Sequence, residues 1–317
     1  MLKKNCSIFL AGHKGLVGSA TLEALKKKGF NNILTVDRKK LDLQNFIKVE
    51  KYFKKKKIDV LIMAAARAGG ILANNRFQKD FFFQNIEIQN SLLKLALKKN
   101  VKKVIFLGTS CIYPKYAKNP ITEDKLLTGN LEKTNQCYAI AKIAGIKLCE
   151  ALFNDHNLDV VCLMPTNIYG VNDKFDQNYG HVIPAMIEKF LYAKNKKLKK
   201  VILFGTGKPI REFLFSEDLA SAIVKIVSTP KKKILKITNN KFPIINVGSN
   251  ESLSIKKLSE LIKKLTGYRG QIYFDKNYPD GTFKKNLDSS KMKKLNWKPK
   301  VNLSSGLKAV INSRKSF

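Results

Sequence analysis

The sequence predicts an α/β fold in which a doubly wound parallel sheet is accompanied by a smaller C-terminal α/β lobe. Two patterns predict it. Short runs of apolar residues alternate with segments of helical periodicity through the first half of the chain. The first of these runs leads directly into a glycine-rich turn that opens a helical segment. Strands of a parallel sheet are covered on both faces, so continuous apolar runs are typical of them.

The expected elements alternate from the N-terminus onward. The expected strands are residues 7–11, 32–36, 60–65, 104–108 and 160–164. The expected helices are residues 17–28, 49–53, 86–97 and 137–154. After residue 165 the pattern loosens into a loop at 169–180, a helix near 184–192 and a mixture of helices and strands. We therefore expect a first domain over residues 1–168, to which segments near 208–250 return, and a lobe over 169–317.

Composition excludes several classes of protein. The 317 residues are 44% hydrophobic and 26% charged, which is enough to build one large domain or two lobes with a core. No run approaches the roughly 20 apolar residues that span a bilayer, and the first residues lack a signal-peptide pattern. Five cysteines without a C-x-x-C pair argue against a disulfide scaffold or a zinc ribbon. We expect a cytoplasmic protein with reduced thiols, no membrane partner and no bound metal.

The formal net charge of +36 raises the question of nucleic-acid binding. Only six of the 60 basic residues are Arg, the residue whose guanidinium reads base edges through paired hydrogen bonds. No nucleic-acid-binding motif is present. We therefore expect lysines spread over a solvated surface, no nucleic-acid partner, and a positive field that attracts anionic substrates.

A glycine-rich turn joins the first expected strand to the first expected helix. Its residues are Gly12, His13, Lys14, Gly15, Leu16, Val17 and Gly18. Gly12 permits a tight turn, Gly15 lets the backbone approach a pyrophosphate, and Gly18 allows close packing of helix and strand. The helix N-terminus then offers free N–H groups to phosphates. Glycine also collects in purely structural turns, but the strand–turn–helix context predicts a Rossmann-type dinucleotide site.

Charged residues beside this turn bear on the choice of cofactor. Asp37, expected at the end of the second strand, would accept a hydrogen bond from a ribose 2′-hydroxyl and favours NAD. Arg38 follows immediately and Lys14 lies within the turn, and two cations there can pair with a 2′-phosphate. Because Arg is scarce in this chain, Arg38 carries more weight, and we expect NADP(H).

Tyr138 and Lys142 lie four residues apart in an expected helix, and so on one helix face. A free phenol has a pKa of about 10. An adjacent ammonium should lower the pKa of Tyr138 toward neutrality, so that the phenol can exchange a proton with a substrate oxygen. An amphipathic helix can hold such a pair by chance, but the dinucleotide turn favours a catalytic role. A hydroxyl after the strand 104–108, from Thr109 or Ser110, would complete the set.

These residues belong to longer segments that carry a resemblance. In order, the segments are GHKGLVGSA from Gly12, AAARAGGILANN from Ala64, FLGTSCIYPK from Phe106, YAIAKIAGIKLCE from Tyr138, MPTNIYG from Met164, HVIPA from His181 and FGTGKPIREFL from Phe204. The match runs from residue 8 to about residue 288. The chain resembles the extended short-chain dehydrogenases/reductases and, within them, is similar to the GDP-L-fucose synthases.

The resemblance implies an NADPH-dependent enzyme that acts on a nucleotide sugar. It would invert C3 and C5 of GDP-4-keto-6-deoxy-D-mannose and reduce C4, giving GDP-L-fucose. Thr109, Tyr138 and Lys142 would form the reductase triad. The family commonly has Ser at the position of Thr109, and Ser110 is the substitute if the mapping is off by one. Cys111 and His181 would form the epimerase pair, although Cys111 can also be read as an inert buried thiol.

Further contacts are implied position by position. The implied cofactor-binding residues are the turn Gly12 to Gly18, Arg38, Leu107, Gly108, Lys142, Pro165, Asn167 and His181. The implied substrate-binding residues are Lys189, Phe204, Arg211 and Asp280. The family often has Trp where Phe204 stands, and Lys189 can also be a plain surface residue in a chain this rich in lysine. The cofactor would lie on residues 1–168 and the substrate mainly on 169–317, in a homodimer formed through helices 86–97 and 137–154.

Two other functions remain open from the sequence. One is another NAD(P)-dependent nucleotide-sugar epimerase or dehydratase. Dehydratases resemble Thr-Asp-Glu where this chain has Thr109-Ser110-Cys111, and UDP-hexose 4-epimerases use NAD and lack the Cys/His pair. The other is a non-catalytic NADP(H)-binding regulatory protein, which the loss of Tyr138, Lys142 or Cys111 would have favoured.

Overall fold

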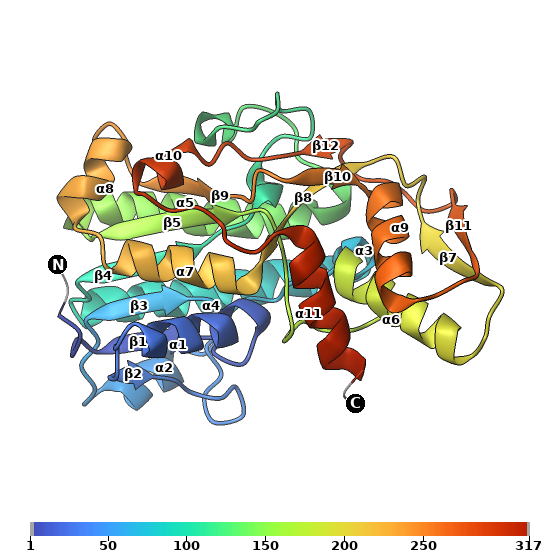
Figure 1. Ribbon diagram of the computed structural model, residues 1–317. Helices are drawn as coiled ribbons and strands as arrows, with labels where there is room; N and C mark the ends of the chain where they lie inside the picture. Colours follow the sequence, from blue (N-terminus) through green and yellow to red (C-terminus); the bar gives the residue numbers. More distant parts are fainter. Residues whose placement is uncertain (1–2, 316–317) are drawn as a thin grey trace.

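A six-stranded parallel sheet forms the centre of the larger region of the molecule (Figure 1). The computed structural model describes residues 3–315. In spatial order the strands are β2 (Ile33–Leu34), β1 (Ile8–Ala11), β3 (Val60–Met63), β4 (Lys103–Leu107), β5 (Val160–Pro165) and β9 (Ile244–Val247). Every neighbouring pair is parallel, and the predicted doubly wound sheet is confirmed.

Both faces of this sheet are buried because side chains alternate along each strand. In β1, Phe9 and Ala11 enter one hydrophobic core, while Ile8 and Leu10 enter the other. Helices of the first face are α2 (Phe46–Phe53), α4 (Gln78–Lys98) and α5 (Gln136–His156). Helices of the second face are α1 (Leu16–Lys27), α7 (Ser216–Val227), α8 (Lys231–Ile237) and α10 (Ser290–Lys294).

Two of the expected elements differ most from the prediction. The second strand pairs with β1 through only Ile33 and Leu34, so Asp37 lies three residues beyond its end. The helix expected at 86–97 begins already at Gln78. Three consecutive phenylalanines at 81–83 do not follow the helical period, which hides the first turns from a pattern search. Asp80 in the first turn favours this helix start through the helix dipole.

A second, smaller region lies beside the carboxyl ends of the central strands, on the right of Figure 1. Its helices are α3 (Ile71–Arg76), α6 (Val182–Asn195), α9 (Ile255–Thr266) and α11 (Leu303–Lys315). Its strands are β6 (Asn167–Tyr169), β7 (Lys200–Phe204), β8 (Ile210–Phe215), β10 (Ser252–Ser254), β11 (Gln271–Asp275) and β12 (Lys284–Lys285). Helices α6, α9 and α11 enclose a third core with strands β7 and β8.

The chain passes between the two regions more than once. Strand β9 joins the central sheet, and α10 with Trp297 packs into the core of its second face. The sequence anticipated a return near 208–250 but not the return of residues 290–297. The chain then crosses to α11 in the third core, while the indole of Trp297 donates to Ser221 Oγ at 2.8 Å. The domain boundary at residue 168 stays a prediction.

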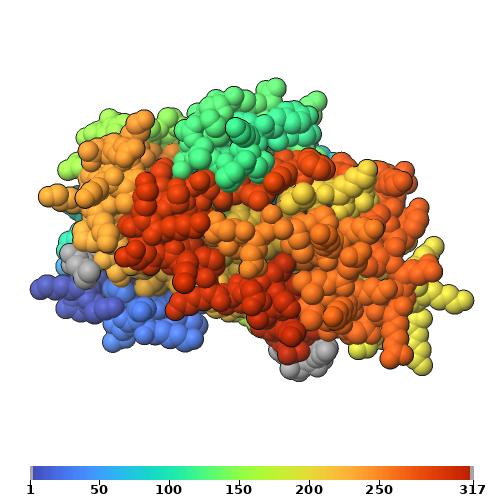
Figure 2. Space-filling model, turned by 45° about the horizontal axis from the view of Figure 1, so that its top comes forward, coloured from blue at the N-terminus to red at the C-terminus, as the bar shows by residue number. Residues whose placement is uncertain are grey.

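A long connection between β4 and α5 forms the upper edge of the molecule, coloured green in Figure 2. It contains three short helices, η1 (Ser110–Ile112), η2 (Glu123–Lys125) and η3 (Lys133–Asn135). The hydroxyl of Tyr113 donates to Asn246 Oδ1 at 2.6 Å, and the Asn246 N–H donates to Glu123 at 2.9 Å. These buried bonds fasten the connection to β9.

Candidate active site

The glycine turn has the geometry that a dinucleotide requires. Gly12 has φ +89°, and a Cβ there would come within 2.6 Å of the Ala65 nitrogen. A Cβ on Gly18 would overlap the carbonyl group of Gly12. The residue that precedes α1 is Gly15, so no side chain caps the first N–H groups of the helix. The turn therefore fits a pyrophosphate laid against the N-terminus of α1.

The Asp37 carboxylate lies beside two basic side chains of the glycine turn, His13 and Lys14. Lys14 Nζ lies 2.9 Å from one oxygen of Asp37, and His13 Nε2 lies 3.2 Å from the other. The hydrogen bond from Lys14 is the main cause that lowers the pKa of Asp37. Arg38 is exposed and makes no ion pair with any residue between 3 and 315. Lys14 is thus shared with Asp37, and Arg38 is the cation left free for a 2′-phosphate.

The three residues of the predicted triad meet where β4 ends. The Thr109 hydroxyl is hydrogen-bonded to Tyr138, and Thr109 Oγ1 also accepts the backbone N–H of Cys111 at 3.2 Å. Lys142 Nζ, one helical turn beyond Tyr138, donates to the Leu107 carbonyl at 2.9 Å. Ser110, the substitute hydroxyl, is 3% exposed at the start of η1. The structure therefore pairs Thr109, rather than Ser110, with the phenol.

The predicted direction of the Tyr138 pKa is wrong. Burial raises the pKa of Tyr138, the nearby Cys111 raises it further, and the hydrogen bond with Thr109 opposes them in part. Lys142 does not contribute to this shift. Burial lowers the pKa of Lys142 itself, to about 8. Tyr138 is therefore a neutral phenol at neutral pH, which is the form that donates a proton to a substrate oxygen.

Lys142→Met is expected to stabilise the fold at neutral pH. Folding lowers the pKa of Lys142 from 10.5 to about 8, so the folded protein at pH 7 holds an ammonium in a buried site. That shift corresponds to at most about 3 kcal/mol, part of which the bond to Leu107 offsets. We expect the free energy of unfolding in urea to rise by about 1–2 kcal/mol at pH 7. The penalty disappears as pH rises from about 8 toward 10.5, so wild type and variant should converge at high pH. A variant that is less stable at pH 7 would contradict this.

Cys111 lies on η1 between the reductase pair and the smaller region. It is half-buried, and its sulfur accepts a hydrogen bond from Asn135 Nδ2 at 3.4 Å. The guanidinium of Arg211, on β8, is close enough to Cys111 to interact with it electrostatically. Sequence reasoning missed Asn135, because an Asn that precedes a helix is normally read as a cap.

His181 directly precedes α6, with φ −65° and ψ 162°. Its ring makes no hydrogen bond with any residue from 3 to 315. Burial lowers the pKa of His181, so the imidazole is neutral at neutral pH. The backbone before it is held by the smaller helix α3, since Gly70 N–H donates to the Tyr179 carbonyl at 3.0 Å. A half-buried ring without partners among the described residues is available to a ligand.

The predicted substrate residues gather around the end of β7. Lys189 Nζ lies 3.8 Å from the centre of the Phe204 ring. Tyr278 joins this group because its ring stacks on the ring of Phe204, with ring centres 4.0 Å apart. Asp280 accepts hydrogen bonds from both the N–H and the hydroxyl of Thr206 at 2.7 Å. Sequence reasoning missed Tyr278, which no local pattern sets apart from the other tyrosines.

The remaining predicted residues lie on, or directly after, β4, β5, β6 and β8. Arg211 donates to the Asp280 carbonyl at 3.4 Å, which joins it to the group around β7. Asn167 Nδ2 donates to the Glu212 carbonyl at 2.9 Å. A Cβ on Gly108 would overlap the sulfur of Met164, so a larger residue there would require the Met164 side chain to move. Leu107 and Pro165 are buried as the last residues of their strands.

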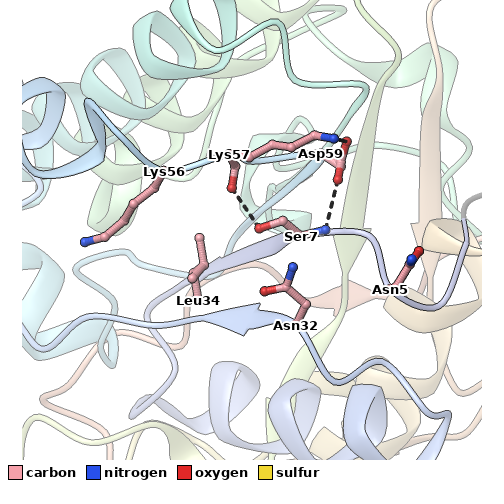
Figure 3. A pocket seen from close by; sticks show the side chains of 7 residues that line it. All are labelled: Asn5, Ser7, Asn32, Leu34, Lys56, Lys57 and Asp59. Carbon is pink, nitrogen blue, oxygen red and sulfur yellow. Dashed lines mark hydrogen bonds and ion pairs between the residues drawn. The ribbon is translucent and has the colours of Figure 1, made fainter.

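A surface pocket of about 370 Å³ lies away from this site (Figure 3). Its lining residues are Asn5, Ser7, Asn32, Leu34, Lys56, Lys57 and Asp59. Ser7 N–H donates to Asp59 Oδ2 at 3.0 Å, and Ser7 Oγ donates to the Lys57 carbonyl at 2.7 Å. Ser7 and Asp59 precede β1 and β3, so the pocket is at the amino ends of the strands, opposite the carboxyl ends where such sheets bind ligands.

Comparison with known proteins identifies the family. Residues 8–248 match the model of the NAD dependent epimerase/dehydratase family. The chain belongs to this family. Between residues 3 and 315, this member has no helix with the length and apolar character needed to cross a membrane. The same residues contain no group of three or more His, Cys, Asp or Glu side chains arranged to hold a metal ion.

Relatives within the epimerase/dehydratase family narrow the resemblance. GDP-L-fucose synthase 1 of Arabidopsis thaliana is 44% identical over 307 residues, which are 97% of this chain and 92% of that protein. A GDP-6-OMe-4-keto-L-xylo-heptose reductase from C. jejuni has a TM-score of 0.93 at 34% identity, with 99% of both chains covered. A GDP-L-fucose synthetase from Naegleria fowleri, bound to NADP, has a TM-score of 0.86 at 25% identity and covers 100% and 96%. The predicted resemblance to the GDP-L-fucose synthases is confirmed.

Proposed function

We propose that this protein is a GDP-L-fucose synthase, which epimerises GDP-4-keto-6-deoxy-D-mannose at C3 and C5 and reduces it at C4 with NADPH. One observation carries the proposal: Cys111 adjoins the reductase pair. Thr109 Oγ1 accepts the Cys111 N–H at 3.2 Å and is hydrogen-bonded to Tyr138. A ketone held by these hydroxyls therefore has a thiol beside it. The relative named GDP-L-fucose synthase supports the same assignment.

Epimerisation needs a base on one face of the sugar and an acid on the other. The Cys111 thiolate takes the proton from the carbon next to the C4 ketone, and the C–H electron pair moves to the ketone oxygen as an enolate. Tyr138 and Thr109 donate hydrogen bonds to that oxygen. His181, whose pKa burial lowers, must be protonated to act as the acid, and its imidazolium then returns a proton to the carbon from the opposite face. One proton transfer from thiol to imidazole restores the pair for the second carbon.

Reduction at C4 uses the same hydrogen-bonding groups. NADPH, when bound, supplies the hydride. Tyr138 donates its phenolic proton to the C4 oxygen, and its neutral state suits this role. Lys142 holds the strand end through Leu107 and would bind the cofactor ribose. The residues that would hold the cofactor are the turn Gly12 to Gly18, Arg38, Leu107, Gly108, Pro165, Asn167 and His181.

The nucleotide end of the substrate is assigned to the group around β7. Arg211 has a guanidinium that can fork onto a diphosphate. Phe204 and Tyr278 form an aromatic stack next to which a base can lie, Lys189 lies over the Phe204 ring, and Asp280 binds Thr206 after the end of β7. The five free cysteines favour the reducing cytoplasm as the place of reaction.

We assign a homodimer to the faces of α4 and α5. These helices pack together on one side of the sheet, where Phe83 is 55% exposed and Ile140 is 40% exposed. Such apolar side chains are typical of a surface that a second copy covers. Light scattering should give the mass of two chains, and the mass of one chain would contradict the assignment.

The function is tested by incubating the protein with GDP-4-keto-6-deoxy-D-mannose and NADPH. We expect consumption of NADPH and GDP-L-fucose as the product, identified by NMR after chromatography. Reduction at C4 with C3 and C5 unchanged would identify a 4-reductase instead. No turnover, or turnover only with other nucleotide sugars, would contradict the proposal.

A further inference from the structure

Asn135 occupies a place where asparagine usually performs a structural task. It ends η3 and is the residue immediately before α5, three positions ahead of Tyr138. At such a position the side-chain oxygen normally accepts a backbone N–H of the first turn, which stabilises the helix by about 1 kcal/mol. The Asn135 side chain makes no such cap. Its amide nitrogen donates instead to Cys111 Sγ at 3.4 Å.

The other end of this amide is unpaired. Asn135 Oδ1 is buried and accepts no hydrogen bond from any residue between 3 and 315. Leaving a buried acceptor unpaired costs about 1–3 kcal/mol. The amide is thus held in an orientation that helix stability does not favour, with its donor end on the sulfur.

Two independent attachments hold Cys111 in place. Thr109 Oγ1 fixes its backbone N–H, and Asn135 fixes its sulfur. Asn135 is itself delivered by η3, where Glu132 pairs with Lys115 at 3.1 Å. The long connection therefore carries Cys111 near its start, after β4, and Asn135 at its end, before α5, and the fold brings the two side chains together.

We propose that Asn135 is a positioning residue for the proton-transfer chemistry of Cys111, which it serves by donating a hydrogen bond to the sulfur and favouring its thiolate form. This rests on the proposed epimerase function of Cys111. An N–H donor stabilises an anionic acceptor more than a neutral one. Within the proposed epimerase pair, a bond that favours the thiolate of Cys111 leaves the proton on His181. Cys111 then begins as the base and His181 as the acid.

The other charged and titratable groups that face Cys111 come from two elements. Tyr138 on α5 is a neutral phenol, and Arg211 on β8 brings a positive charge. Glu132 and Asp280 face that guanidinium and partly offset its charge. Arg211 therefore acts in the same direction as Asn135 but without direct contact. Because Asn135 contacts the sulfur directly, its removal should change the reactivity of the Cys111 thiol more than the removal of any other of these groups.

The test measures the reactivity of the thiol without any substrate. Each protein is alkylated with iodoacetamide over a range of pH, and each cysteine is followed by mass spectrometry of its peptide. Asn135→Asp keeps the shape of the side chain but replaces the donor by an anionic oxygen. We expect the midpoint of Cys111 alkylation to move upward by about one pH unit or more, while the midpoint of half-buried Cys137 stays unchanged.

Matched variants separate this effect from others. Asn130→Asp adds the same charge at an exposed position of the same connection and should leave Cys111 unchanged. Asn135→Ala removes the donor without adding charge and should move the midpoint in the same direction by a smaller amount. Buried Cys149 and Cys162 report folding, because they become reactive only if the chain opens. If Asn135→Asp does not fold, the midpoint of Cys111 alkylation in Asn135→Ala tests the proposal.

The catalytic consequence is measured separately. Exchange of the C3 and C5 protons with deuterated solvent should fall about tenfold in Asn135→Asp, as one pH unit implies, and by less in Asn135→Ala. The pH profile of exchange should shift upward in both variants. An unchanged alkylation midpoint in folded Asn135→Ala and Asn135→Asp would overturn the proposal. Failure of the wild type to turn over the sugar would overturn the proposed function alone, because alkylation needs no sugar.

Discussion

Tyr138→Phe should lower the rate of C4 reduction by about 10²–10⁴-fold, the usual contribution of a positioned proton donor. The phenol is buried and hydrogen-bonded to Thr109, and it keeps its proton at neutral pH. Phe removes only the hydroxyl and retains the edge contact with Phe81, at 6.0 Å between ring centres. NADPH oxidation in a single turnover measures the loss.

Solvent exchange at C3 and C5 distinguishes this effect from a loss of binding. Cys111 and His181 remain in Tyr138→Phe, so deuterium should still enter the sugar, although more slowly because the enolate oxygen has lost one donor. Tyr116→Phe makes the same change at a side chain that is 86% exposed and should leave both rates unchanged. Reduction at the wild-type rate in Tyr138→Phe would remove Tyr138 from the mechanism.

Cys111→Ser should impair epimerisation at C3 and C5 and leave reduction at C4 largely intact, which is the reverse of the pattern expected for Tyr138→Phe. Exchange at C3 and C5 should fall by about 10²–10⁴-fold, because a serine hydroxyl is not ionised near neutral pH and cannot replace a thiolate base. The backbone bond to Thr109 is unaffected, so the triad stays in place. The ketone should then be reduced without inversion, and NMR should detect the unepimerised 4-hydroxy product.

The control for this variant is Cys137→Ser. Cys137 is also half-buried, but its sulfur lies near Gln78 rather than beside the triad. We expect GDP-L-fucose from Cys137→Ser at the wild-type rate. Undiminished GDP-L-fucose from Cys111→Ser would exclude Cys111 as the base and leave its reading as an inert thiol.

The sequence predicted the central sheet well, because its strands are buried on both faces. Strands β1, β3 and β5, and β4 after Lys103, are short apolar runs without interruption, and such runs need no tertiary information to be recognised. The first turns of α4 escaped because their phenylalanines break the helical period. The return of residues 290–297 escaped because packing against a distant sheet leaves no local signal.

In the site, as in the fold, the sequence predicted what depends on residue spacing and not what depends on the folded environment. The spacing of Tyr138 and Lys142 predicted that they share a helix face, but spacing does not report burial. Burial decides the direction of both pKa shifts, so the electrostatic expectation failed. Asn135 was hidden for a related reason: its sequence position favours a helix cap, and only the folded connection brings it to Cys111.

The C-terminal segment acts as a tether between the two regions. The Asp218 carboxylate on α7 accepts the backbone N–H groups of Lys300 and Val301, both at 2.9 Å, just before the chain reaches α11. The indole of Trp297 adds a third attachment to the same helix. A hinge opening between the regions would have to break these bonds. The substrate residues of the smaller region are therefore held in place before the sugar nucleotide arrives, and their ordering reduces its binding energy little.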